Sequence, residues 1–321
     1  MMNGVAGEGR RALLITLVLL GGIAALVWVG VRTGHLGTSL APVDAATPTP
    51  TRPAATSPRP SASATSTPSA SPSPTLVAPD PEVVAAFDAV TAGLGGEYAL
   101  AWVDGDGLHV LGEPVDETAW STIKVPLSIA AVGHGAAAGS DPWPDIEPAI
   151  TRSDNDAALR LWSSLGQPQE AAAAVDEVLR TYGSAGTRTE SEGVRPPFTP
   201  FGQTQWSLVD QARFAAAVAC APGASAAGEV RAVMGRVVED QRWGIGRVET
   251  AYLKSGWGPD DSGAYVLRQL GDGVVDGRWQ ALALSGRAAD GSYPQGAADL
   301  SALVEWWART AADGPSLVCT Q

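Results

Sequence analysis

Residues 121–130 read Ser-Thr-Ile-Lys-Val-Pro-Leu-Ser-Ile-Ala. It opens a helical pattern over 121–138, which places Ser121 and Lys124 one turn apart on the same face. The chain has two lysines against 19 arginines, and an amine can lose its proton at accessible pH whereas a guanidinium cannot. Because apolar neighbours would lower the lysine pKa, we predict that Lys124 is the base for a nucleophilic Ser121.

The second lysine also lies beside a serine, in Lys254-Ser255-Gly256 on a predicted strand over 250–256. Glycine there permits a ligand to approach the backbone closely. Between the two lysines, Ser153-Asp154-Asn155 precedes a predicted helix, and this pattern taken alone is also an ordinary helix cap. Each pattern is weak by itself, but the two lysine contexts together are harder to attribute to chance.

The order of predicted elements indicates the fold. An amphipathic helix is expected from Asp80-Pro81 to Leu94, with proline at its first position. Alternating patterns predict strands and helical patterns predict helices, in the order two strands, five helices, three strands and a last helix. The ranges are 98–103, 108–111, 121–138, 156–164, 168–181, 207–219, 226–239, 250–256, 263–270, 278–285 and 297–312. We therefore expect an α/β fold of the α+β type, in which a five-stranded antiparallel sheet is flanked by helices and carries an inserted all-helical lobe.

The three motifs S-x-x-K, S-D-N and K-T-G, in this order, are the signature set of class A β-lactamases and penicillin-binding proteins, and residues 80–315 resemble that family. Ser255 stands in place of the threonine and keeps the hydroxyl. The resemblance implies an acyl-enzyme on Ser121, with Lys124 taking its proton. It implies that Ser153 passes a proton to the departing nitrogen and that Lys254 keeps this region positive.

The resemblance also implies how a substrate would be held. Asn155 would hold the substrate amide, and Lys254 with Ser255 would bind the substrate carboxylate beside Gly256. The backbone N–H groups of Ser121 and Trp257 would form the oxyanion hole. No metal or organic cofactor is implied, since the two cysteines and three histidines show no zinc-ligand spacing.

The chain departs from the family in the spacing of its first two motifs. Ser121 and Ser153 are 32 positions apart, whereas class A relatives place these elements nearly twice as far apart. The intervening stretch 133–148 is short and rich in glycine, alanine and proline. We therefore expect a trimmed helical lobe and a more open cleft.

A second departure concerns the residues that would release the acyl group. Class A β-lactamases hold the deacylating water with an E-x-x-N element between S-D-N and K-T-G. Glu190 and Glu192 are the candidate bases here, but the residues three positions later are Gly193 and Arg195 rather than asparagine. The sequence supports acylation, and it favours a solvated acidic loop over fast deacylation.

Three functions follow from these patterns. The first is a β-lactamase-like serine hydrolase that acts on β-lactams, the second is a D,D-carboxypeptidase or transpeptidase that acts on peptidoglycan stem peptides, and the third is a non-catalytic module that binds cell-wall fragments or proteins. Rival nucleophiles are disfavoured because no G-x-S-x-G motif occurs. His109 and His134 are expected to be structural.

The N-terminal part is interpreted as a membrane tether. Residues 1–11 are expected to be a cytoplasmic tail, and the uncharged residues 12–31 are long enough to span a bilayer as an uncleaved signal-anchor; a removed signal peptide is the alternative. Residues 32–79 are a Pro/Ser/Thr-rich linker that we expect to be disordered. The prediction is a single-pass protein of the cell membrane whose domain, 80–321, is extracytoplasmic and monomeric.

Charge and cysteine content add two expectations for residues 80–321. This part carries 16 basic and 32 acidic side chains, so it should repel nucleic acid and anionic lipid. Cys220 and Cys319 both lie in this exported part, where a disulfide that holds the C-terminus is a candidate pairing; two separate thiols are the alternative.

Overall fold

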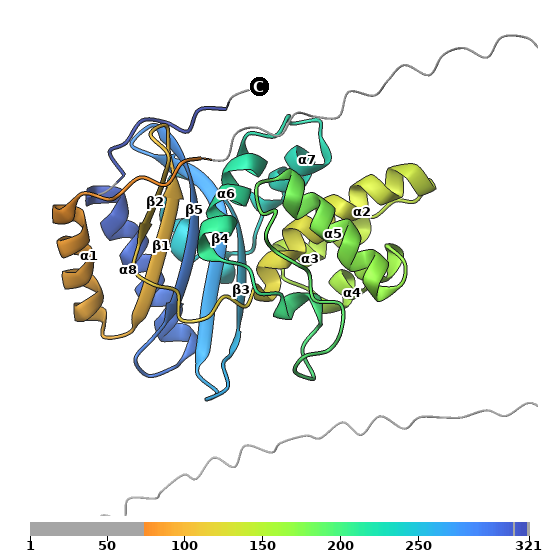
Figure 1. Ribbon diagram of the computed structural model, residues 1–321, viewed down its shortest axis with the longest axis horizontal. Helices are drawn as coiled ribbons and strands as arrows, with labels where there is room; N and C mark the ends of the chain where they lie inside the picture. Colours follow the sequence, from red (N-terminus) through yellow and green to blue (C-terminus); the bar gives the residue numbers. More distant parts are fainter. Residues whose placement is uncertain (1–73, 311, 320–321) are drawn as a thin grey trace, which may run out of the picture. The chain divides into compact units, whose positions relative to one another are not determined.

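The computed structural model describes residues 74–310 and 312–319 (Figure 1). The predicted tail over 1–11, the predicted membrane anchor over 12–31 and most of the linker lie outside these residues. In the part that the structure describes, no helix has the length and apolar character needed to cross a bilayer. Residues 75–77, which the sequence assigns to the linker, hydrogen-bond to Leu108 at the start of a strand.

The predicted five-stranded antiparallel sheet is confirmed. Its order is β2-β1-β5-β4-β3, so the chain adds its last three strands beside its first two and leaves β3 at an edge. The strands are β1 (Glu97–Val103), β2 (Leu108–Leu111), β3 (Thr250–Pro259), β4 (Tyr265–Val275) and β5 (Arg278–Arg287). The free edge of β3 is available to groups outside the sheet.

Helices cover both faces of this sheet (Figure 1). Alternation along β1 sends Leu100 and Trp102 to one side, where they pack with buried residues of the two terminal helices, and sends Ala99 and Ala101 to the other side, where they join the core of the helical lobe. The described helices are α1 (Pro81–Leu94), α2 (Lys124–Ala138), α3 (Trp143–Thr151), α4 (Asn155–Ser164), α5 (Pro168–Thr181), α6 (Leu208–Ala219), α7 (Ala226–Met234) and α8 (Tyr293–Thr310).

Three helix predictions need correction. The Pro-rich stretch after α2 contains the unpredicted helix α3, whose prolines include one at a first-turn position, where the fixed φ suits a helix, and whose Ile146 and Ile150 are buried. The helix predicted over 226–239 ends at Met234, before Gly235. The last helix begins at Tyr293 rather than at 297.

A disulfide joins Cys220, which follows α6, to Cys319 in the C-terminal tail. The tail also pairs with the body of the fold, because Leu317 N donates to Trp279 O at 2.7 Å and Gly105 N donates to Pro315 O at 2.9 Å. The tail is therefore a structural part of the fold, held by both covalent and hydrogen bonds.

We expect loss of this disulfide to lower the free energy of unfolding by about 2–5 kcal/mol, because it closes a long loop and restricts the unfolded chain. The 99-residue separation places it among long loops. Urea unfolding of the wild type with and without reducing agent measures the loss, and the Cys220→Ser/Cys319→Ser double variant should not respond to the reductant. An unchanged midpoint in the double variant would contradict the prediction.

Candidate active site

Ser121 lies in a tight turn just before α2. The turn is the 3₁₀ segment Trp120–Ile123, so the α-helix itself begins at Lys124 rather than at Ser121. Trp120 has φ +49°, a left-handed conformation that is unfavourable for a bulky residue. Thr122 Oγ1 donates to Ala119 O at 2.5 Å and accepts from Gln211 Nε2 at 3.2 Å. These bonds hold the turn and leave Ser121 half-buried.

Lys124 is buried directly behind this turn, with 1 % of its surface exposed. Its Nζ donates to Ser153 O at 2.6 Å, to Asn155 Oδ1 at 2.7 Å and to Asp154 O at 3.3 Å. Burial lowers the pKa of Lys124 to about 7, while the charge of Asp154 acts in the opposite direction. The amine can therefore be neutral, and so act as a base, near neutral pH.

The Ser153–Asn155 turn connects both lysines. Ser153 has φ +59°, which turns its carbonyl to Lys124 while its Oγ accepts from Lys254 Nζ at 2.8 Å. Asp154 caps α4 by accepting from Ala157 N at 2.8 Å. The motif is thus a helix cap and, at the same time, the contact point of the two amines.

Lys254 on β3 has no exposed surface. Besides Ser153 Oγ, its Nζ donates to Ser255 O at 2.7 Å. Burial, and then the charge of Lys124, hold the pKa of Lys254 well below its usual range. Two buried amines joined through Ser153 form a set of groups that can exchange protons among themselves.

Ser255 does not face the cleft, contrary to its predicted role in binding the substrate carboxylate. Its hydroxyl is fully buried, donates to Gln241 O at 3.1 Å and accepts from Gln269 Nε2 at 2.9 Å. The reason is the two-residue alternation of β3, which points Lys254 toward the helical lobe and Ser255 to the opposite face. No local sequence pattern indicates that Gln241 and Gln269 hold this hydroxyl.

Gly256 lies against the nucleophile turn. A Cβ at this position would lie 2.8 Å from Ser121 N and 2.9 Å from Thr122 N, so only glycine lets the strand approach this closely. The carbonyls of Ser255 and Pro259 accept from the side chains of Lys254 and Arg195 rather than from a neighbouring strand. In a strand, the N–H and C=O of one residue point to the same edge, and successive residues point to opposite edges. Trp257 lies two positions from both Ser255 and Pro259, so its N–H should also face the free edge of β3.

Glu190 lies on a loop joined to the nucleophile turn. Its N donates to Thr204 Oγ1 at 3.0 Å, and Thr204 O accepts from Ala119 N at 2.8 Å, two residues before Ser121. The Glu190 carboxylate accepts from the backbone N–H groups of Ser191 and Glu192 at 3.1 and 3.2 Å. Glu192 is exposed. The loop is near the site, but one oxygen of its central carboxylate binds its own backbone.

The histidines lie apart from this network. His109 Nε2 is 3.1 Å from Asp104 Oδ1, and its ring stacks on Trp102 on the sheet. His134 is exposed on α2. In residues 74–310 and 312–319, no group of three or more His, Cys, Asp or Glu side chains could hold a metal ion. The described site thus consists of two buried amines that both hydrogen-bond to Ser153, with the Ser121 turn immediately before Lys124 in the chain.

Comparisons with known proteins relate this arrangement to solved structures. No family model and no curated protein matches the chain. A class A β-lactamase from Bacteroides cellulosilyticus is similar with a TM-score of 0.57 and 12% identity over 68% of this chain and 94% of its own. PBP-A has a TM-score of 0.55 and 15% identity, over 74% of this chain and 98% of its own. A variant of the last common ancestor of Gram-negative bacterial class A β-lactamases has a TM-score of 0.50 and 19% identity, over 71% of this chain and 99% of its own.

Proposed function

Because this chain has the fold of the class A β-lactamase and penicillin-binding protein family, we propose that it is a serine hydrolase that forms an acyl-enzyme on Ser121 with β-lactams or related amides. One observation carries the proposal: Lys124 and Lys254 are both buried and both hydrogen-bond to Ser153. Burying two amines is costly, and a module that only binds would have little use for them.

Acylation follows from these contacts. Neutral Lys124 exchanges one of its present acceptors for the Ser121 hydroxyl and takes its proton as Oγ attacks the substrate carbonyl carbon. The carbon–nitrogen bond then breaks, and Ser153 Oγ passes its proton to the leaving nitrogen. Ser153 is reprotonated through the adjacent amines, with Lys254 Nζ at 2.8 Å. The developing oxyanion would accept from the N–H groups of Ser121 and Trp257, each worth about 10²–10³ in rate in comparable sites.

Substrate binding is proposed to rely on exposed groups beside this network. Asn155 is exposed and its Oδ1 accepts from Lys124, so its amide nitrogen can face a substrate carbonyl. In its protonated form, the fully buried Lys254 would supply positive potential near a substrate carboxylate. The buried hydroxyl of Ser255 takes no part.

Deacylation is proposed to be slow, which favours a penicillin-binding D,D-peptidase as the second candidate function. A general base must be free to bind the attacking water, and one oxygen of the Glu190 carboxylate, Oε1, already accepts two backbone N–H groups. We expect Glu190→Gln to acylate within about threefold of the wild-type rate and to change the lifetime of the adduct by less than tenfold. A general base typically contributes about 10²–10⁴ in rate, and this contribution would be absent from the wild-type deacylation step. A much longer lifetime in this variant would instead identify Glu190 as the deacylation base.

The cellular setting is proposed from the sequence. Residues 12–31 would hold the chain in the cell membrane and the Pro/Ser/Thr-rich linker would space residues 80–321 from it, on the extracytoplasmic side. The Cys220–Cys319 disulfide supports this placement because disulfides persist in oxidising compartments. Peptidoglycan stem peptides would then be within reach.

Incubation of the full chain with a fluorescent penicillin tests the proposal. A stable adduct would support a penicillin-binding enzyme, and an adduct that fades as the drug is consumed would support a β-lactamase. Absence of any adduct on correctly folded protein, with benzylpenicillin as well as with the fluorescent compound and even at high drug concentration, would remove the assignment to β-lactams and favour a binding module.

A further inference from the structure

Arg195 joins three segments at the far end of β3. Its Nη1 lies 2.9 Å from Asp261 Oδ1, and its Nη2 donates to Pro259 O. The guanidinium also lies over the rings of Trp120 and Phe198, 5.6 and 5.2 Å from their centres. Arg195 therefore links the Glu190 loop to the β3–β4 hairpin across the residue that precedes Ser121. Arg195 stands three residues after Glu192, where the class A element would have asparagine.

This contact limits the free edge of β3. A substrate that lies along an edge strand needs unpaired N–H and C=O groups. Lys254 Nζ occupies Ser255 O at one end, and Arg195 occupies Pro259 O at the other, while Pro259 has no N–H. Between the two blocked carbonyls lie four residue steps, about 13 Å at 3.3 Å per residue. Within that span, Trp257 presents both a backbone donor and a backbone acceptor.

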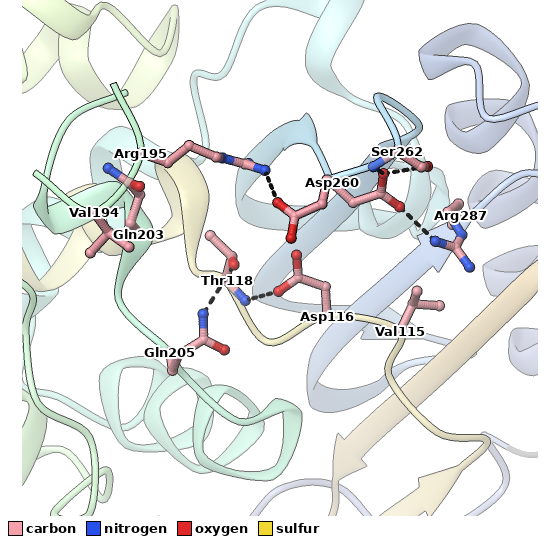
Figure 2. A pocket seen from close by; sticks show the side chains of 11 residues that line it. Val115, Asp116, Thr118, Val194, Arg195, Gln203, Gln205, Asp260, Ser262 and Arg287 are labelled. Atoms are coloured by element: carbon pink, nitrogen blue, oxygen red, sulfur yellow. Dashed lines mark hydrogen bonds and ion pairs between the residues drawn. The ribbon is translucent and has the colours of Figure 1, made fainter. Parts of the chain in front are cut away.

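A hollow lies next to Arg195, outside the span just described. Its volume is about 470 Å³, and Figure 2 shows Arg195 and Gln203 on one side of it and Asp260, Ser262 and Arg287 on the other. The charges on the far side are paired, since Arg287 Nη1 is 2.6 Å from Asp260 Oδ2. Arg195 lines this hollow and also contacts Trp120, so its guanidinium lies between the hollow and the nucleophile turn.

Trp120 completes the barrier on the side of the strand. A Cβ at Gly258 would lie 2.3 Å from the Trp120 ring, so this ring rests directly on β3, one residue before Pro259. Phe198 packs edge-on against the same ring, with 5.2 Å between centres. The end of the cleft is thus closed by the buried Trp120 ring under the Arg195 guanidinium, and 34% of the Arg195 side chain is exposed.

We propose that Arg195 is a specificity-determining residue that closes the Pro259 end of the cleft and restricts the substrate to a compact acyl group on the scissile amide. This inference rests on the proposed function. The preferred substrates would be β-lactams or short N-acyl peptides whose acyl part ends near Trp257. Larger acyl groups would have to displace the guanidinium to enter the adjacent hollow.

The test compares acylation by two penicillins, benzylpenicillin and a penicillin that carries a bulky dye on its acyl group, both followed by intact-protein mass. In Arg195→Ala we expect the rate constant for the bulky compound, relative to benzylpenicillin, to rise about tenfold, within the range that pocket shape can discriminate. Asp261→Asn should shift the ratio less and in the same direction, because the bond to Pro259 O remains. Asp261 is 99% exposed, so this variant should fold even if Arg195→Ala does not.

Arg188→Ala is the matched control. Arg188 lies on the same loop, but its Nη1 donates to Ala185 O and Thr187 O, so the ratio should stay at the wild-type value. An unchanged ratio in Arg195→Ala or, where that variant is unfolded, in Asp261→Asn would overturn the role of Arg195 while leaving the proposed function in place. Failure of both penicillins to label any folded variant would overturn the proposed function and this inference with it.

Discussion

Ser121→Ala should form no covalent adduct with a fluorescent penicillin, because the variant removes the only atom that the mechanism uses to attack the carbonyl. Loss of a nucleophile of this kind costs about 10⁶ in rate. The fold should be unaffected, since the turn is held by Thr122 and by backbone contacts with Gly256 rather than by the Ser121 side chain. Gel fluorescence and intact-protein mass measure the adduct.

Ser163→Ala is the control for this variant. Ser163 is an exposed serine on α4, away from both lysines, so its removal should leave labelling at the wild-type level. If Ser121→Ala were labelled as fast as Ser163→Ala, the nucleophile would be another residue and the acyl-enzyme assigned to Ser121 would be wrong.

Lys124→Arg should lower the rate of acylation by about 10²–10⁴, because a guanidinium stays protonated and cannot take the Ser121 proton. In the wild type, the rate should rise with pH through the Lys124 pKa of about 7 and level off above it. The sign follows from the charge state: below that pKa the amine is protonated and is no base, and above it the neutral amine predominates. Single-turnover acylation between pH 5 and pH 9 measures both effects.

Lys254→Arg is the comparison for this experiment. It keeps a positive charge beside Ser153 Oγ, so we expect a smaller loss than in Lys124→Arg and a retained rise of the rate near pH 7. Circular dichroism should accompany both variants, because both sites are fully packed. Equal losses in the two variants, or a wild-type rate independent of pH, would contradict the assignment of Lys124 as the base.

The main elements of the fold could be predicted because their signals are local. The apolar periodicity of a strand or a helix can be recognised within a short stretch of sequence. The five strands lie where these patterns predict them, with ends that differ by up to five residues. Helix α3 was missed because its prolines read as loop residues, although one sits in the first turn, where proline is tolerated. The late start predicted for α8 reflects the same limit on locating helix ends.

Short sequence patterns identify the reactive groups: a serine one turn before one of only two lysines, a Ser-Asp-Asn helix cap, and a second lysine two residues before a glycine. How these groups come into contact depends on the tertiary structure. Ser153 reaches both amines because its backbone adopts φ +59°, Ser255 turns into the core because strand alternation gives it the face opposite Lys254, and Arg195 meets Asp261 across 66 positions. Residue type and short spacing are local properties, whereas the face of a strand and contacts between distant loops depend on how the sheet and the lobe pack together.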